Sequence, residues 1–139
     1  ILAQAVFRSR RVPGFFFARS GRRGCRRGMP LATVITDCPA LIAKSADVAK
    51  AVHECVKGSL GKPDMYITVS VTRAECVMVA GEPQSAVVQV DSIGGKLGPF
   101  TAAVCEKFAE LGGVPKEKVT CTFRSVDGKE FAMNGKTIF

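Results

Sequence analysis

Hydrophobic and polar residues alternate along the chain with two periods, two and about 3.6 residues, which are typical of strands and helices. Short apolar runs rich in β-branched residues predict four strands, at residues 31–36, 66–71, 86–93 and 119–123. Apolar residues spaced by three and four predict two amphipathic helices, over residues 41–60 and 100–111. The order strand, helix, strand therefore occurs twice.

Each predicted helix ends at a glycine, and a proline lies two residues beyond that glycine. Gly61 and Pro63 come after the first helix, and Gly113 and Pro115 come after the second. Glycine accepts the left-handed conformation that ends a helix, and proline cannot continue one. The two halves thus repeat one plan, although their sequences are not identical.

Two β-α-β units side by side predict an α+β fold with one four-stranded sheet and both helices on one face. The other face would then need a cover. We expect this face to be apolar, with strand residues such as Ile67, Val69, Val71, Val88 and Val90. On that ground alone we expect copies of the chain to associate.

Weaker signals predict the remaining elements. Residues 77–79 resemble a short strand, and residues 92–98 form a glycine-rich loop between a strand and a helix. Asp127 and Gly128 are a tight-turn pair, which we expect to send a final short strand back through residues 131–133.

Positive charge is concentrated at the start of the chain, whose net charge is +8. Residues 1–28 contain eight arginines and no acidic residue, so the remaining 12 Lys and Arg balance the 12 Asp and Glu. Nucleic-acid binding depends on clustered cations, and the neutral segment therefore argues against nucleic acid as a partner. We divide the chain into a basic extension, residues 1–29, and a folded domain, residues 30–139.

The composition of the extension resembles an organelle transit peptide that is removed. Two alternatives stay open, namely translated non-coding sequence ahead of a start at Met29, and a retained disordered arm. Six scattered cysteines without a Cys-x-x-Cys pair, and one histidine, predict free thiols that fill the core, with no metal site and no cofactor. A reducing compartment, the cytoplasm, is then expected; an organelle or secretion by a non-classical route are the alternatives. No apolar run is long enough to span a membrane.

Four groups of residues, in this order and spacing, resemble the macrophage migration inhibitory factor and D-dopachrome tautomerase family. They are Met29-Pro30, Gly61-Lys62-Pro63 with Tyr66, Asp91-Ser92-Ile93-Gly94, and Met133-Asn134-Gly135. The resemblance spans residues 29–139. It implies the tandem β-α-β tautomerase fold, a homotrimer with sites between neighbouring subunits, and keto–enol tautomerisation of small aromatic 2-oxo acids or dopachrome. A protein receptor is a further partner that it suggests.

The resemblance assigns Pro30 the role of acid–base catalyst. An internal proline nitrogen is an amide and cannot accept a proton near neutral pH, whereas an N-terminal proline is a secondary amine that can. Removal of Met29 is therefore required. Apolar burial and the charge of Lys62 would both lower the pKa of this amine.

The resemblance also assigns the substrate contacts. Lys62 would pair with the substrate carboxylate, although a lysine at a helix end also interacts favourably with the helix dipole. The backbone N–H of Ile93 would hold an anionic oxygen, assisted by Ser92. The other residues placed in the pocket are Tyr66, Thr120, Thr122, Phe131 and Met133.

Some pocket positions depart from the family pattern. Thr120 and Thr122 replace an aromatic residue and an asparagine that come from the adjoining subunit, and Met133 replaces a tryptophan. Aromatic stacking is thereby reduced, so we expect weaker activity or a different substrate choice. The alternative function is a cytokine-like binding protein with little or no enzymatic activity.

Overall fold

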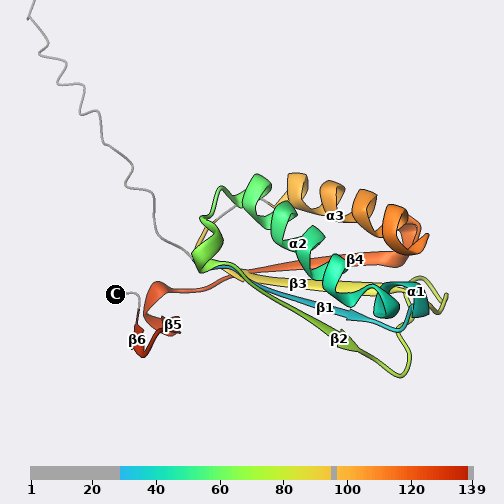
Figure 1. The fold of residues 1–139 in the computed structure, drawn as a ribbon, viewed down its shortest axis with the longest axis horizontal. Helices are drawn as coiled ribbons and strands as arrows, with labels where there is room; N and C mark the ends of the chain where they lie inside the picture. The colour runs from blue at the N-terminus through green and yellow to red at the C-terminus, as the bar shows by residue number, and fades with distance from the viewer. Residues whose placement is uncertain (1–28, 95–96, 138–139) are drawn as a thin grey trace, which may run out of the picture.

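A computed structural model describes residues 29–94 and 97–137. The basic extension, except Met29, lies outside the described residues, as do Gly95 and Lys96 of the glycine-rich loop. The described chain has three helices and six strands, with a 3-10 turn before β2, before β4 and before β5 (Figure 1). In chain order the elements are β1 (Leu31–Thr36), α1 (Pro39–Ala43), α2 (Ser45–Leu60), β2 (Thr68–Arg73), β3 (Ala86–Ser92), α3 (Leu97–Gly112), β4 (Val119–Ser125), β5 (Ala132–Met133) and β6 (Lys136–Thr137).

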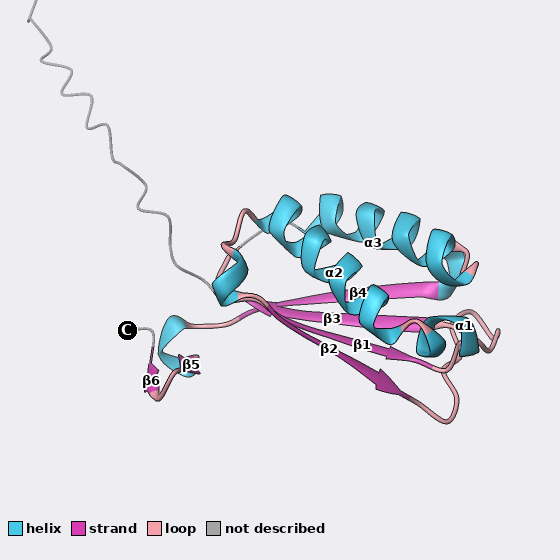
Figure 2. Ribbon diagram, in the orientation of Figure 1, coloured by secondary structure: helices cyan, strands magenta, loops and turns pink. Residues whose placement is uncertain are grey.

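The first four strands form one sheet in the order β2-β1-β3-β4. Strands β1 and β2 are parallel, as are β3 and β4, and the two pairs meet along antiparallel β1 and β3. Helices α2 and α3 lie together on one face of this sheet (Figure 2). The predicted α+β architecture of two β-α-β units is confirmed.

The core lies between the sheet and the helices. Every second residue of β1 is buried, and α2 and α3 supply the opposing apolar side chains. The largest fully buried apolar side chains include Leu41, Val52, Val88, Phe100 and Phe108. Burying such a side chain contributes about 1.5–3 kcal/mol, which makes this layer the main source of stability.

The expectation of an apolar uncovered face is wrong. Val88 and Val90 are buried in the core, and Ile67, Val69 and Val71 pack against it. The strand register puts mainly polar residues on the other face, in three rows: Thr68, Leu31, Asp91 and Arg124; Ser70, Thr33, Gln89 and Thr122; and Thr72, Ile35, Val87 and Thr120. The period of two was correct, but the helices cover the more apolar set because burying it stabilises the fold most.

The first helix differs from the prediction of one helix over residues 41–60. It begins at Pro39, since proline suits the first turn of a helix, and it breaks at Lys44, whose φ of −109° and ψ of 33° are not helical. Strand β2 begins at Thr68 because Tyr66 closes a 3-10 turn that comes after Pro63. Residues 77–79 form a single bridge, between Val79 and Glu82, instead of a strand.

The repeated helix endings are confirmed. Gly61 and Gly113 have φ values of 61° and 65°, which only glycine adopts without strain. Their N–H groups donate to the carbonyls of Lys57 and Ala109, four residues earlier. Each ending leads through a proline and a 3-10 turn into the second strand of its unit.

The predicted final short strand is confirmed as β5, but its pairing and the turn before it differ from the prediction. Residues 132 and 133 pair with residues 136 and 137 instead of returning to the main sheet. Asn134 and Gly135, with φ values of 53° and 75°, make the turn of this hairpin. Asp127 instead begins a 3-10 turn, because its carboxylate accepts a hydrogen bond from the N–H of Lys129 at 3.1 Å.

The five described cysteines are free. Cys38 and Cys55 are buried, as expected of core residues, but Cys76 is exposed in the loop after β2. No helix among the described residues is long and apolar enough to cross a membrane.

Candidate active site

Pro30 lies immediately before β1, at the end of the sheet where β1 begins and β3 finishes. Its side chain is fully buried, and its carbonyl accepts a hydrogen bond of 3.1 Å from the N–H of Thr68. The antiparallel pairing of Leu31 with Asp91 brings Ser92 beside Pro30 on the neighbouring strand. The strand pairing thus fixes the position of the proline.

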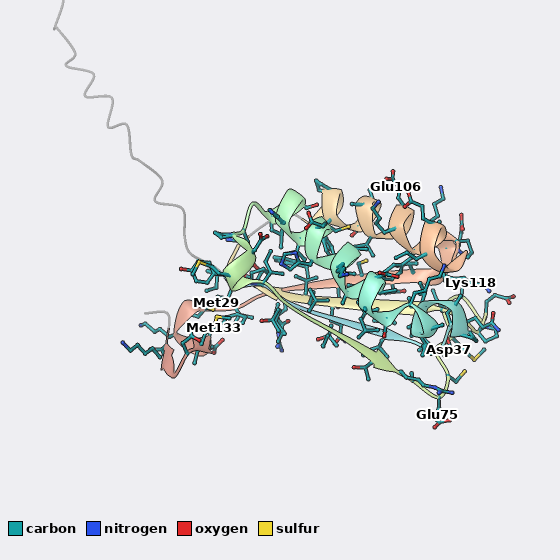
Figure 3. The ribbon with its side chains drawn as sticks, viewed as in Figure 1. Met29, Asp37, Glu75, Glu106, Lys118 and Met133 are labelled. Carbon is teal, nitrogen blue, oxygen red and sulfur yellow. The ribbon has the colours of Figure 1, made fainter. Side chains whose placement is uncertain are left out.

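A cavity of about 200 Å³ opens beside this proline. Its lining residues come from the start of β1, from β2 and from the C-terminal hairpin segment: Met29, Pro30, Leu31, Thr68, Phe131, Ala132 and Met133. Met29 and Met133 lie close together at this end of the molecule (Figure 3). Pro30, Phe131 and Met133, three of the predicted pocket residues, therefore border one hollow.

Lys62 lies at the same end of the sheet, directly after Gly61. It is 9% exposed, and its Nζ donates to the carbonyl oxygen of Ile93 at 3.3 Å. The left-handed Gly61 turns the chain so that this lysine reaches across to the other β-α-β unit. Lys62 and Ile93 are therefore adjacent.

Ser92 and Tyr66 occupy less open positions. The Ser92 side chain is fully buried, and its Oγ donates to the carbonyl of Gly94 at 3.0 Å. Tyr66 is half-buried and precedes Thr68 by two residues. Lys62, Ile93, Ser92 and Tyr66 surround the Pro30 end but do not line the 200 Å³ cavity.

Thr120 and Thr122 are not brought to Pro30 within one chain. Both are exposed on the uncovered face, paired with Val87 and Gln89. Thr120 shares its row with Ile35, five residues from Pro30, or roughly 17 Å along the strand. Only a neighbouring copy of the chain could place these two residues beside Pro30.

The sequence did not predict four of the cavity residues, Met29, Leu31, Thr68 and Ala132, as pocket residues. Thr68 could have been found from a parallel pairing of the first two strands, which places it next to Leu31.

A second hollow of about 470 Å³ shares Leu31, Phe131 and Ala132 with the first and is also lined by Asp91 and Arg124. These two form an ion pair, with Arg124 Nη2 at 2.8 Å from Asp91 Oδ2, and the hydrogen bond to Asp91 raises the pKa of Arg124.

The opposite end of the sheet is closed by hydrogen bonds. Asp37 accepts them from the N–H groups of Gln84 and Ser85, at 3.2 and 3.0 Å, and Thr36 Oγ1 donates to the Ser85 carbonyl at 2.8 Å. Desolvation raises the pKa of Asp37, but these hydrogen bonds, with others from the backbone of Val77 and of Asp37 itself, outweigh it and lower the pKa below 3.8.

No group of three His, Cys, Asp or Glu side chains within residues 29–94 and 97–137 could hold a metal ion.

Comparison with known proteins gives consistent results. The family model described as macrophage migration inhibitory factor matches residues 29–139. A macrophage migration inhibitory factor homolog of Brugia malayi is 28% identical over 114 residues, which cover 78% of this chain and 98% of that protein.

Solved structures share the fold. Macrophage migration inhibitory factor of Toxoplasma gondii has a TM-score of 0.71 and 26% identity, over 78% of this chain and 99% of that one. A macrophage migration inhibitory factor-like protein of Entamoeba histolytica has a TM-score of 0.72 at 18% identity, over 79% of this chain and 99% of that one, and this likeness concerns the fold alone.

Proposed function

Since the chain belongs to the macrophage migration inhibitory factor family, we propose that it is a keto–enol tautomerase of small aromatic 2-oxo acids, with Pro30 as the acid–base catalyst. The observation that carries the proposal is the position of Pro30, buried at the edge of a cavity with Phe131 and Met133. A ring nitrogen there could reach a substrate held in the hollow.

The catalytic group exists only when the bond between Met29 and Pro30 is cut. The nitrogen then becomes a secondary amine, which takes a proton from the carbon next to the substrate carbonyl and returns it to the carbonyl oxygen, so that the keto form becomes the enol; the reverse reaction moves the proton back. Burial disfavours the protonated amine, and the nearby ammonium of Lys62 has the same effect. Both lower the pKa of the amine and keep it ready to accept a proton.

Two groups at the same end would hold the substrate anion. The ammonium of Lys62 would pair with the carboxylate, and the N–H of Ile93 would donate to an anionic oxygen. Their proximity, with Lys62 Nζ at 3.3 Å from the Ile93 carbonyl oxygen, supports a shared role. Phe131 and Met133 provide apolar surface for the aromatic ring.

The test compares three proteins in a phenylpyruvate tautomerisation assay: the chain beginning at Pro30, its Pro30→Gly variant, and the full chain. Intact mass verifies each N-terminus. We expect kcat/KM to fall about 10²–10⁴-fold in the variant and in the full chain, the usual contribution of a positioned acid–base group. Equal activity of all three proteins would refute the role of Pro30.

We also expect the chain to form a homotrimer, as is typical of its family. The uncovered sheet face and the position of Thr120 and Thr122, far from Pro30 within one chain, support this, because a neighbouring copy could supply both to the site. Light scattering on the protein that begins at Pro30 should give the mass of three chains. A fully active monomer would contradict it.

The second candidate is a cytokine-like binding protein with little enzymatic activity. The observation that favours it is the small size of Thr120 and Thr122, which offer no ring to stack on an aromatic substrate. The same assay separates the two functions. An inactive protein with an authentic Pro30 N-terminus and a trimeric mass would leave the binding function.

A further inference from the structure

Ser92 has an unusual position for a predicted substrate contact. Its side chain is fully buried, and its Oγ donates to the Gly94 carbonyl at 3.0 Å. The hydroxyl is therefore engaged with the backbone of the next turn, and solvent does not reach this side chain. Such a hydroxyl is suited to holding the backbone and not to contacting a ligand.

Each carbonyl in the turn of residues 92–94 accepts a hydrogen bond. The Val126 N–H donates to the Ser92 carbonyl at 3.1 Å, Lys62 Nζ donates to the Ile93 carbonyl at 3.3 Å, and Ser92 donates to the Gly94 carbonyl. Because a peptide unit is planar and trans, fixing its carbonyl also fixes the N–H of the next residue. The Ser92 carbonyl and the Ile93 N–H belong to one peptide unit, so the bond from Val126 sets the direction of this N–H. The bond from the Ser92 hydroxyl to the Gly94 carbonyl closes the far side of the same turn.

We propose that Ser92 is a positioning residue, whose hydroxyl closes the turn of residues 92–94 and so keeps the Ile93 N–H and the Lys62 ammonium aligned for a substrate carboxylate. The inference rests on the proposed function for its catalytic consequence. Its structural part, the ordering of the turn, can be tested separately. Gly94 has a φ of 73° and lies beyond the end of β3, and the three hydrogen bonds described above hold this turn.

The chain provides a matched control at the other end of the same strand. Ser85 directly precedes β3, is also fully buried, and its Oγ donates to the carbonyl of Glu82 at 2.8 Å. Ser85→Ala thus removes the same kind of buried hydrogen bond as Ser92→Ala, but far from the candidate site. A purely structural role of Ser92 would make the two variants behave alike.

The kinetic test uses both variants of the protein that begins at Pro30, with phenylpyruvate as substrate. We expect Ser92→Ala to raise KM about tenfold while kcat changes less than about twofold, and Ser85→Ala to leave both constants unchanged. Ser92→Thr, which keeps the hydroxyl, should restore most of the affinity. Equal KM values in the two alanine variants would overturn the proposal, as would a loss of kcat at constant KM.

A second measurement is independent of turnover. Amide hydrogen exchange at Ile93 and Gly94 should be at least about tenfold faster in Ser92→Ala than in Ser85→Ala. If the unmodified processed protein shows no tautomerase activity, the proposed function fails, whereas the positioning role is decided by this exchange rate. Equal exchange in the two variants would refute the positioning role whatever the activity.

Discussion

The two ends of the four-stranded sheet are built on one plan but differ in the residue next to the helix-ending glycine. At one end Gly113 precedes Val114, which is 2% exposed and joins the core. At the other end Gly61 precedes Lys62, whose ammonium reaches Ile93. The same backbone turn thus delivers an apolar anchor to one end and a cation to the other.

The residues that precede the two central strands differ in the same way. Ser85, before β3, is held by Asp37 and Thr36 through side-chain hydrogen bonds. Pro30, before β1, has its carbonyl bound by Thr68 and borders a cavity. We call these the sealed end and the open end. The two copies of a repeated turn can therefore serve different purposes: one copy buries an apolar residue that stabilises the fold, and the other positions a charged residue that can bind a substrate.

After Pro30→Gly, the largest effect is expected from Lys62→Met, which removes the cation from the open end at similar side-chain length. Charge-assisted hydrogen bonds contribute roughly 1.5–3 kcal/mol, so KM for phenylpyruvate should rise about 10- to 100-fold. Lys57→Met is the control, because Lys57 is exposed and pairs with Asp64. Similar KM values for both variants would show that the open end does not bind the carboxylate through Lys62.

Gly112→Ala should damage the sealed end. A Cβ there would lie 2.6 Å from Cδ2 of the fully buried Leu41, and such overpacking costs about 1–3 kcal/mol. Urea unfolding should show this loss while KM stays unchanged. Gly58→Ala is the control, since a Cβ at Gly58 meets no atom within 4 Å; it should stabilise the protein by up to about 1 kcal/mol.

Asp37→Asn should change how stability at the sealed end depends on pH. The pKa of Asp37 is lowered below 3.8 in the folded protein, so its carboxylate contributes stability above pH 3.8 that is lost as pH falls through the folded pKa. Urea midpoints measured from neutral to acidic pH should decline less steeply in the variant. Asp47→Asn, which changes an exposed carboxylate on α2, should keep the wild-type pH dependence.

Chemical modification of Cys76, the exposed cysteine in the loop at the sealed end, should have the smallest effect on function. Burial raises the pKa of Cys121 to about 11, so its thiolate is scarce at neutral pH, whereas Cys76 is exposed. A thiol reagent should therefore modify Cys76 fastest in the protein that begins at Pro30. The fast phase should vanish in Cys76→Ser and persist in Cys121→Ser, and tautomerisation should continue after this modification.

The alternation of residues was sufficient to predict the two β-α-β units, because period and helix-ending glycines are local signals. The alternation also separated the more apolar face of each strand, which is the face that the helices cover, but the expectation left that face uncovered. The break at Lys44 and the pairing of β5 with β6 were also missed. Each depends on competition between local turn geometry and packing, which a window of sequence does not contain.

Predictions for the site divide in the same way. Pro30, Phe131 and Met133 do border one cavity, and Lys62 does meet Ile93, but these residues were identified through family resemblance and not from periodicity. Their catalytic roles stay predictions. Ser92 shows what motif matching leaves out, because burial and a hydrogen-bond partner become visible only in three dimensions.

The bond from Thr68 to the Pro30 carbonyl has a consequence for maturation. It holds the ring from its carbonyl side, which hydrolysis ahead of the ring does not touch. The carbonyl of Pro30 is already bound in a chain that still carries Met29, so removal of Met29 would not need to rebuild this contact. A protease or aminopeptidase that removed Met29 would then activate the protein by freeing the Pro30 nitrogen, while the surrounding fold stayed the same.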